Sequence, residues 1–307
     1  MQDAHTGLKD VKYLKPLLCG RYEKFDIPKF EEIYRPTQSE HPFYTYHDKP
    51  FSKERYQYSC LPIHTGPFQI KLPLDDKKTD MITNVLRCPI KDANSRSIYL
   101  PEELGFLKDY VMYCNIYENS FNMRYEELFS HITVDYKHLE PGDYHRVKGF
   151  HVDGFQGHKF PVKHEIEHSY LWSSNNFRQD SDSNSDNIMG TEFCVQPFFL
   201  NHIDDSKYLI FNEMEKQANP DNIYQCLNNN VYIFDPYMVH RTPVAKQTTD
   251  RLLVRITFEY QKLLDPNDTI SPEPSLQFKV PYKYDIRNRL GDYTINLNHH
   301  MFGFHKV

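Results

Sequence analysis

The stretch Gly149-Phe150-His151-Val152-Asp153-Gly154 places a histidine and an aspartate one residue apart. In an extended segment alternate side chains leave the same face, so His151 and Asp153 would point to one place while Val152 points into the opposite layer. Glycines flank the pair in a chain with only 11 glycines, and glycine permits tight turns and close ligand approach. The segment therefore predicts two metal ligands presented together.

A third ligand would have to come from a distant part of the chain. His240, in the segment Val239-His240-Arg241-Thr242-Pro243, would complete a set of two histidines and one carboxylate. Such a set holds non-haem Fe(II) on one side and leaves the other coordination positions open. Because the three residues are far apart in the sequence, only the fold can bring His240 to the first pair.

A histidine two residues before an acidic residue is weak evidence by itself. With 16 histidines in 307 residues, about one such triplet is expected by chance. His202-Ile203-Asp204 is a second example, and His138-Leu139-Glu140 is the glutamate version. The neighbours of His202 are polar and predict an exposed turn. His151 differs because of its flanking glycines and the residues that follow it along the chain.

Length and composition predict a globular protein. An apolar content of 39% and a charged content of 25% are ordinary, and 307 residues can bury a large core. We expect one catalytic domain, in which residues 132–262 form a β core, residues 1–131 support it and residues 263–307 extend it. The net charge of −6 gives no general attraction to nucleic acid. Six scattered cysteines and the lack of a membrane-length apolar run favour a soluble, cytoplasmic protein.

Hydrophobic periodicity predicts one helix followed by many short strands. A helix should begin at Pro101, ahead of the acidic pair Glu102 and Glu103, and its apolar stripe would be Leu104, Leu107, Val111 and Cys114. Turns rich in Pro, Gly and Asn separate the expected strands at 132–136, 144–153, 162–172, 190–200, 231–234 and 252–259. The alternation in 162–172 predicts a half-buried strand, and the polar residues 173–189 predict a surface loop or a lid. This pattern indicates a mainly β sandwich or jelly roll with flanking helices.

The order of these motifs, His-x-Asp, a distant His and then an Arg, resembles the iron(II)- and 2-oxoglutarate-dependent dioxygenases over roughly residues 132–260. The resemblance implies a double-stranded β-helix, a cupin-like jelly roll, for the core. It also implies that His151, Asp153 and His240 are the iron ligands. The cofactors would be Fe(II), 2-oxoglutarate and O₂. The implied reaction is hydroxylation of a substrate with release of succinate and CO₂.

The resemblance further implies residues for the co-substrate. Thr191, which follows Gly190 ahead of a strand, is similar to the threonine that helps to hold the distal carboxylate of 2-oxoglutarate in the taurine-dioxygenase-like branch. Arg251, eleven residues after His240, falls where that branch keeps an arginine for the same carboxylate. Arg255 shares its strand face, and an arginine there contacts substrate or co-substrate. A guanidinium suits this task because it binds a carboxylate in a bidentate manner.

The substrate is expected to be a small molecule or a peptide. Basic residues near the first ligand segment favour an anionic one, although such residues are more often simply solvated. They are Arg146, Lys148, Lys159 and Lys163. The sequence indicates neither the identity of the substrate nor the oligomeric state.

Three rival interpretations remain open. His164-Glu165-Ile166-Glu167-His168 matches the HExxH motif of zinc metallopeptidases, but that motif needs a helix, and the alternation of this segment favours a strand. A β-helix domain could instead serve as a catalytically inactive binding module. A cupin-type metalloenzyme without 2-oxoglutarate is the third possibility, and Arg251 together with Thr191 argues against it.

Overall fold

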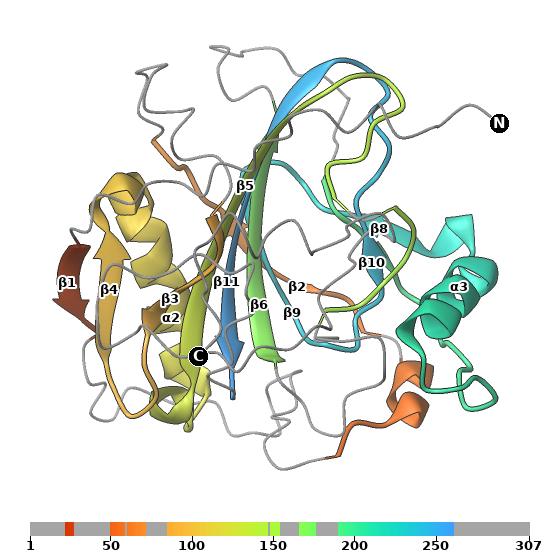
Figure 1. Ribbon diagram of the computed structural model, residues 1–307, viewed down its shortest axis with the longest axis horizontal. Coiled ribbons are helices and arrows are strands. Elements are labelled where there is room, and N and C mark those ends of the chain that lie inside the picture. The colour runs from red at the N-terminus through yellow and green to blue at the C-terminus, as the bar shows by residue number, and fades with distance from the viewer. Residues whose placement is uncertain are drawn as a thin grey trace, which may run out of the picture.

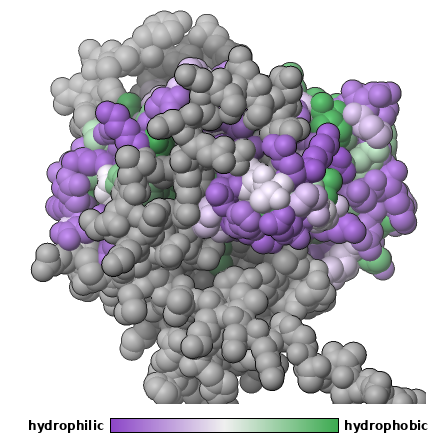
Figure 2. Space-filling model, turned by 90° about the horizontal axis from the view of Figure 1, so that it is seen from above, coloured by the Kyte–Doolittle hydropathy of each residue, from purple (hydrophilic) through white to green (hydrophobic). Residues whose placement is uncertain are grey.

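The computed structural model describes residues 22–27, 50–58, 60–71, 85–146, 148–153, 166–175 and 190–260. These residues form a mainly β structure with antiparallel sheets and few helices, which confirms the predicted class and is compatible with a β-sandwich or cupin-like fold (Figure 1). Within these ranges no helix is long and apolar enough to cross a membrane. Seen from above, the described surface is mostly hydrophilic, with hydrophobic residues in small groups (Figure 2).

A six-stranded antiparallel sheet of order β2-β9-β6-β11-β5-β3 forms the centre of the structure. Its strands are β2 (Ile63–Pro67), β3 (Val85–Lys91), β5 (Phe129–Leu139), β6 (Ile166–Asn175), β9 (Asn230–Phe234) and β11 (Thr249–Glu259). Strands β5 and β11 pair along their whole length, from Thr249 opposite Leu139 to Glu259 opposite Phe129. The expected strands at 132–136, 231–234 and 252–259 are therefore confirmed.

The remaining elements lie on either side of this sheet (Figure 1). A three-stranded sheet of order β10-β7-β8 consists of β7 (Glu192–Cys194), β8 (Ile223–Gln225) and β10 (His240–Arg241). Strands β1 (Tyr22–Asp26) and β4 (Ser97–Pro101) pair with each other. In the described ranges the helices are α2 (Lys108–Phe121), α3 (Lys207–Gln217) and four short 3₁₀ helices at Lys53–Gln57, Glu102–Leu107, Tyr125–Glu127 and Pro220–Asn222.

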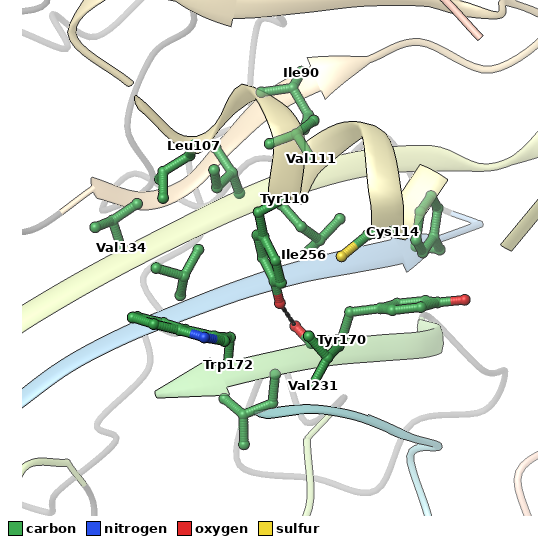
Figure 3. Packing of buried hydrophobic residues seen from close by; sticks show 14 of the residues in the cluster. Ile90, Leu107, Tyr110, Val111, Cys114, Val134, Tyr170, Trp172, Val231 and Ile256 are labelled. Carbon is green, nitrogen blue, oxygen red and sulfur yellow. Dashed lines mark hydrogen bonds between the residues drawn. The ribbon is translucent and has the colours of Figure 1, made fainter. Parts of the chain in front are cut away.

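Helix α2 covers one face of the large sheet. Tyr110 and Val111 are buried against the sheet, and the Tyr110 hydroxyl donates a hydrogen bond to the backbone carbonyl of Tyr170 at 3.1 Å (Figure 3). From β11, Ile256 packs into this same core. Because strand side chains alternate, the even-numbered apolar residues of β11 face α2, and Arg251 and Arg255 lie on the opposite face.

The predicted apolar stripe of the helix is confirmed, but its start is corrected. Leu104, Leu107, Val111 and Cys114 are all fully buried. Pro101, however, still belongs to β4, where it pairs with Tyr22. The segment that follows is a 3₁₀ helix, and the α-helix begins only at Lys108.

Strand β6 is more buried than its alternation predicts. All residues of Ile166–Ser174 are buried on both faces, and α2 covers one of these faces. Ser173, Ser174 and Asn175, expected in a loop, complete this strand, whereas residues 162–165 and 176–189 lie outside the described residues. Polar side chains here do not mark a surface, because they line the second face of a covered sheet.

Two other strand predictions are also wrong in extent. Among the described residues between 144 and 153 only two isolated bridges form, Tyr144 with Val244 and His151 with His240. The residues described between these bridges are mostly bends, and Gly149 has a left-handed φ of 84°, which does not fit an extended strand. Of residues 190–200, only Glu192–Cys194 is a strand.

Candidate functional site

The structure brings His151, Asp153 and His240 together. Each offers one ligand atom, and these atoms all lie within 4.8 Å of one another. The two histidines form an antiparallel bridge in which each backbone N–H donates to the other's carbonyl oxygen at 2.9 Å. Their rings lie 4.6 Å apart, so the backbone pairing fixes the distance between the two imidazoles.

Both imidazoles are oriented by backbone carbonyl groups. The Nδ1 of His151 lies 3.1 Å from the carbonyl oxygen of Gly149, and the Nδ1 of His240 lies 2.8 Å from that of Met238. A carbonyl oxygen only accepts hydrogen bonds, so each Nδ1 carries the proton and each Nε2 keeps its lone pair. This is the tautomer that a metal-ligating histidine needs, with its second nitrogen held by a hydrogen bond.

The protonation states suit a cation site. Burial lowers the pKa of His151 to about 3, and burial also lowers the pKa of His240. Burial alone would raise the pKa of Asp153, but the nearby Arg255 guanidinium lowers it overall. At neutral pH the cluster therefore offers two neutral imidazoles and one carboxylate, which is the donor set of a facial triad.

Arg255 contacts the carboxylate of this cluster. Its Nη1 donates to Oδ2 of Asp153, and the arginine is only 8% exposed. The sequence left open whether Arg255 contacts substrate or co-substrate. In the structure it holds one oxygen of Asp153 and leaves the other oxygen for a cation.

Arg251 lies further along the same face of β11 and is fully buried. Its Nη2 lies 3.4 Å from Oγ1 of Thr191, and its Nη1 lies 3.2 Å from Nδ1 of His145. Within the described residues no carboxylate comes within ion-pair distance of this guanidinium. Burial lowers the pKa of Arg251 to about 10, although the charge of Asp135 acts to raise it. A buried cation without a contacting anion is costly, so the site favours an anionic ligand.

Two further groups beside Arg251 were not predicted from the sequence. Asn175 is its cross-strand partner on β6, and the Nδ2 and Oδ1 atoms of Asn175 are buried without a hydrogen-bond partner in the described part of the chain. The same holds for Nε of Arg251. His145 is kept neutral because burial lowers its pKa, and its Nε2 lies 3.4 Å from Oδ1 of Asp135. No short motif marks Asn175 or His145; only the strand pairing and chain path reveal them.

Gly190 allows Thr191 to reach Arg251. A Cβ on Gly190 would lie 1.8 Å from the backbone oxygen of Cys226, so only glycine fits there. The next residue, Thr191, accepts a hydrogen bond from the Cys226 N–H through its carbonyl at 2.9 Å. This close backbone approach holds the threonine hydroxyl against the guanidinium.

The other candidate histidines lie elsewhere. His202 is exposed in a turn, as predicted, and His138 is also exposed. Of the HExxH motif, His164 and Glu165 lie outside the described residues, while Ile166–His168 belong to strand β6 rather than to a helix. Strand β6 directs His168 to α2, where its Nδ1 lies 2.9 Å from Oε1 of Glu118. His168 therefore contacts α2 and does not belong to the cluster of His151, Asp153 and His240. Lys159, Lys163, His299 and His300 also lie outside the described residues.

Comparisons with known proteins give little guidance. No family model matches the chain. A comparison with curated proteins finds no match either. Among solved structures, the crystal structure of EvdO2 from Micromonospora carbonacea var. aurantiaca aligns with 50% of this chain and 64% of that chain, at 13% identity and a TM-score of 0.30. The match thus spans less than two thirds of EvdO2, and likeness at this level assigns no family.

Proposed function

We propose that this protein is an Fe(II)- and 2-oxoglutarate-dependent oxygenase that hydroxylates its substrate. The observation that carries the proposal is a pair of adjoining features on one sheet face. One is the cluster of His151, Asp153 and His240, with ligand atoms within 4.8 Å. The other is the buried Arg251, which has no carboxylate partner among the described residues. The large and small sheets would then be the two halves of a double-stranded β-helix.

The donor set fits a catalytic iron centre. Two neutral imidazoles and one carboxylate leave other coordination positions open, as in non-haem Fe(II) oxygenases. Catalytic zinc sites can use a similar set, so the buried Arg251 is what favours iron with 2-oxoglutarate over zinc. Arg255 occupies Oδ2 of Asp153, so Oδ1 would face the metal. When bound, iron and 2-oxoglutarate supply the activation of O₂ and the oxidation of a substrate C–H bond.

The residues around Arg251 would hold the far carboxylate of 2-oxoglutarate. The guanidinium supplies a planar set of donors that fits a carboxylate, and its Nε has no other hydrogen-bond partner in the described ranges. Thr191 and the amide of Asn175 add neutral hydrogen-bonding groups on either side. Burial excludes water from this end, which strengthens the charge interaction.

The substrate would be a small molecule or a peptide that reaches the open side of the metal. Arg255 is not a free cation for an anionic substrate, because it already binds Asp153. An anionic substrate would therefore have to be bound by other basic residues near the first ligand segment. The described cysteines Cys60, Cys88, Cys114, Cys194 and Cys226 are free thiols, which fits a location in the cytoplasm.

The test combines spectroscopy with product analysis. Anaerobic addition of Fe(II) and then 2-oxoglutarate should give a visible metal-to-ligand charge-transfer band, and O₂ should then yield succinate. The variant His151→Ala is the blank for both signals. A protein that binds 2-oxoglutarate but never forms succinate with any substrate would be a binding module. Zinc-dependent proteolysis without the band would establish the peptidase instead.

A further inference from the structure

A carboxylate from helix α3 contacts the backbone just before the first ligand. Oε2 of Glu215 accepts a hydrogen bond from the backbone N–H of Phe150 at 2.8 Å. The approach is close because Gly149 has no side chain; a Cβ there would lie 3.2 Å from the same oxygen. The Glu215 side chain is 50% exposed, so its position is not explained by packing in the core.

The peptide group that Glu215 contacts also holds the ring of His151. The N–H of Phe150 and the carbonyl of Gly149 belong to one planar, resonance-stabilised peptide unit. Its N–H end donates to Glu215, and its carbonyl end accepts from Nδ1 of His151 at 3.1 Å. Hydrogen bonds in such a chain polarise one another, so a negative charge at the N–H end makes the carbonyl a stronger acceptor.

A stronger hydrogen bond at Nδ1 makes the opposite nitrogen a better metal ligand. A carboxylate that accepts from a metal-ligating histidine acts in this way, by fixing the ring and raising its basicity. Here the carboxylate is one peptide group away from the ring. We propose that Glu215 is a positioning residue that acts on His151 through the Gly149–Phe150 peptide and strengthens metal binding; the proposal rests on the metal centre of the proposed function.

Arg241, in the second ligand segment, contacts both Phe150 and Glu215. It follows His240 directly, and its guanidinium lies 4.3 Å from the centre of the Phe150 ring. Its Nε donates to Glu192 at 2.7 Å, while its Nη1 is 3.8 Å from Oε1 of Glu215. Glu192 thus takes the shorter contact with Arg241, and Oε2 of Glu215 remains available to the peptide N–H.

The alternative is that Glu215 only holds the Gly149–Phe150 backbone in place and does not affect His151 through its charge. The variant Glu215→Gln separates the two ideas, because an amide oxygen still accepts from the Phe150 N–H but carries no charge. Glu215→Ala removes both the acceptor and the charge. Glu213→Gln is the matched control, since Glu213 lies on the same helix and contacts Gln217 and Lys216 rather than the ligand segment.

The experiment titrates the metal-free protein with Co(II) and follows the visible absorption of the bound ion. Changes in groups that hydrogen-bond to metal-ligating histidines weaken binding by about 10- to 100-fold, and we expect about tenfold for Glu215→Ala because the action passes through a peptide. Glu215→Gln should also weaken binding, by less, and Glu213→Gln should match the wild type. Far-ultraviolet circular dichroism of each variant checks that the fold is kept.

A second readout needs no metal. The ¹⁵N and ¹H resonances of the His151 Nδ1–H group in the metal-free protein report the strength of its hydrogen bond. They should move in both Glu215 variants and stay fixed in Glu213→Gln. Wild-type cobalt affinity or unchanged His151 resonances in Glu215→Gln, which the alternative predicts, overturn the relay, and so does either result in Glu215→Ala. If the wild type itself binds no cobalt, the proposed metal centre fails, and the resonances still decide whether the relay exists.

Discussion

Replacing Arg251 with methionine should remove 2-oxoglutarate binding without unfolding the protein. In the bound state the guanidinium would face a buried carboxylate. Truncating one partner of such a pair costs about 2–5 kcal/mol, which corresponds to roughly 30- to 5,000-fold in the dissociation constant. Arg251→Lys keeps the charge but loses the planar set of donors, so its loss should be smaller.

In contrast to 2-oxoglutarate binding, the free energy of unfolding of the metal-loaded protein without 2-oxoglutarate should change little in Arg251→Met. Methionine removes a fully buried cation that has no contacting carboxylate among the described residues, and replacing buried charges by apolar residues is often neutral or stabilising. It also removes contacts to His145 and Thr191, and each buried group left unpaired costs about 1–3 kcal/mol. Because these effects oppose each other, we expect the free energy of unfolding to change by less than about 2 kcal/mol.

Denaturant unfolding with and without 2-oxoglutarate measures both quantities, with Mn(II) replacing iron. At a ligand concentration of about 100 times the wild-type dissociation constant, the wild type should gain about 2.7 kcal/mol. Arg251→Met should gain less than about 1 kcal/mol, because even a 30-fold weaker affinity reduces the stabilisation by bound 2-oxoglutarate to that level. Arg96→Met, remote from the site and paired with Glu126, should keep the full gain. Loss of more than about 4 kcal/mol without ligand, with the full gain retained, would show that Arg251 is structural.

Two further predictions concern residues around the site and the core. Gly190→Ala should lower the free energy of unfolding by about 1–3 kcal/mol or more and weaken 2-oxoglutarate binding, because the new Cβ would lie 1.8 Å from a backbone oxygen. Gly105→Ala is the control for both measurements, because there is open space around Gly105. Burial lowers the pKa of His168, but Glu118 raises it to about 9 overall, so the stability this histidine contributes is complete below pH 6.5 and lost as the pH rises through about 9. Between pH 6.5 and about 9 the free energy of unfolding of the wild type, measured in denaturant titrations, should fall by on the order of 3 kcal/mol relative to His168→Gln. Equal pH profiles of the two proteins would show that the His168–Glu118 pair does not contribute this stability.

Local periodicity was enough to predict the elements that meet the core on one face. The apolar spacing of Leu104 to Cys114 predicted the helix packed across the sheet, and the apolar run from Leu252 predicted β11. It also placed Arg251 and Arg255 on a shared face. These patterns are local because one face of each element touches a single apolar layer.

The errors arise where a distant neighbour changes the environment of a segment. Strand β6 alternates in polarity, yet both of its faces are buried, because the second face lies over the polar site. The left-handed φ of 84° at Gly149 cut short the strand expected before His151. Neither fact is visible in the sequence, since each depends on which segments the fold places alongside.

In the candidate site too, some residues could be predicted from local patterns and others depend on distant parts of the chain. The spacing of His151, Asp153, His240 and Arg251 suggested that they belong together, and the fold does bring them to one face, while their roles stay predictions. Asn175 and His145 could not be predicted, since they reach Arg251 through strand pairing and the path of the chain. Glu215 lies on a helix with no recognisable motif.

The register of β11 links the core to the site. Side chains alternate with a period of two, so a slip of one residue would turn Arg251 and Arg255 into the apolar layer under α2 and expose Ile256 to the metal cluster. Both guanidiniums would lose their present partners, Asp153 for Arg255 and Thr191 and His145 for Arg251, and would be buried in a mainly apolar layer at a cost of several kcal/mol each. The pairing of β11 with β5 over all 11 residues, together with its pairing to β6, prevents this slip. The most extensively paired of the described strands is therefore also the one that carries both arginines, which keeps their distance from the ligand cluster fixed.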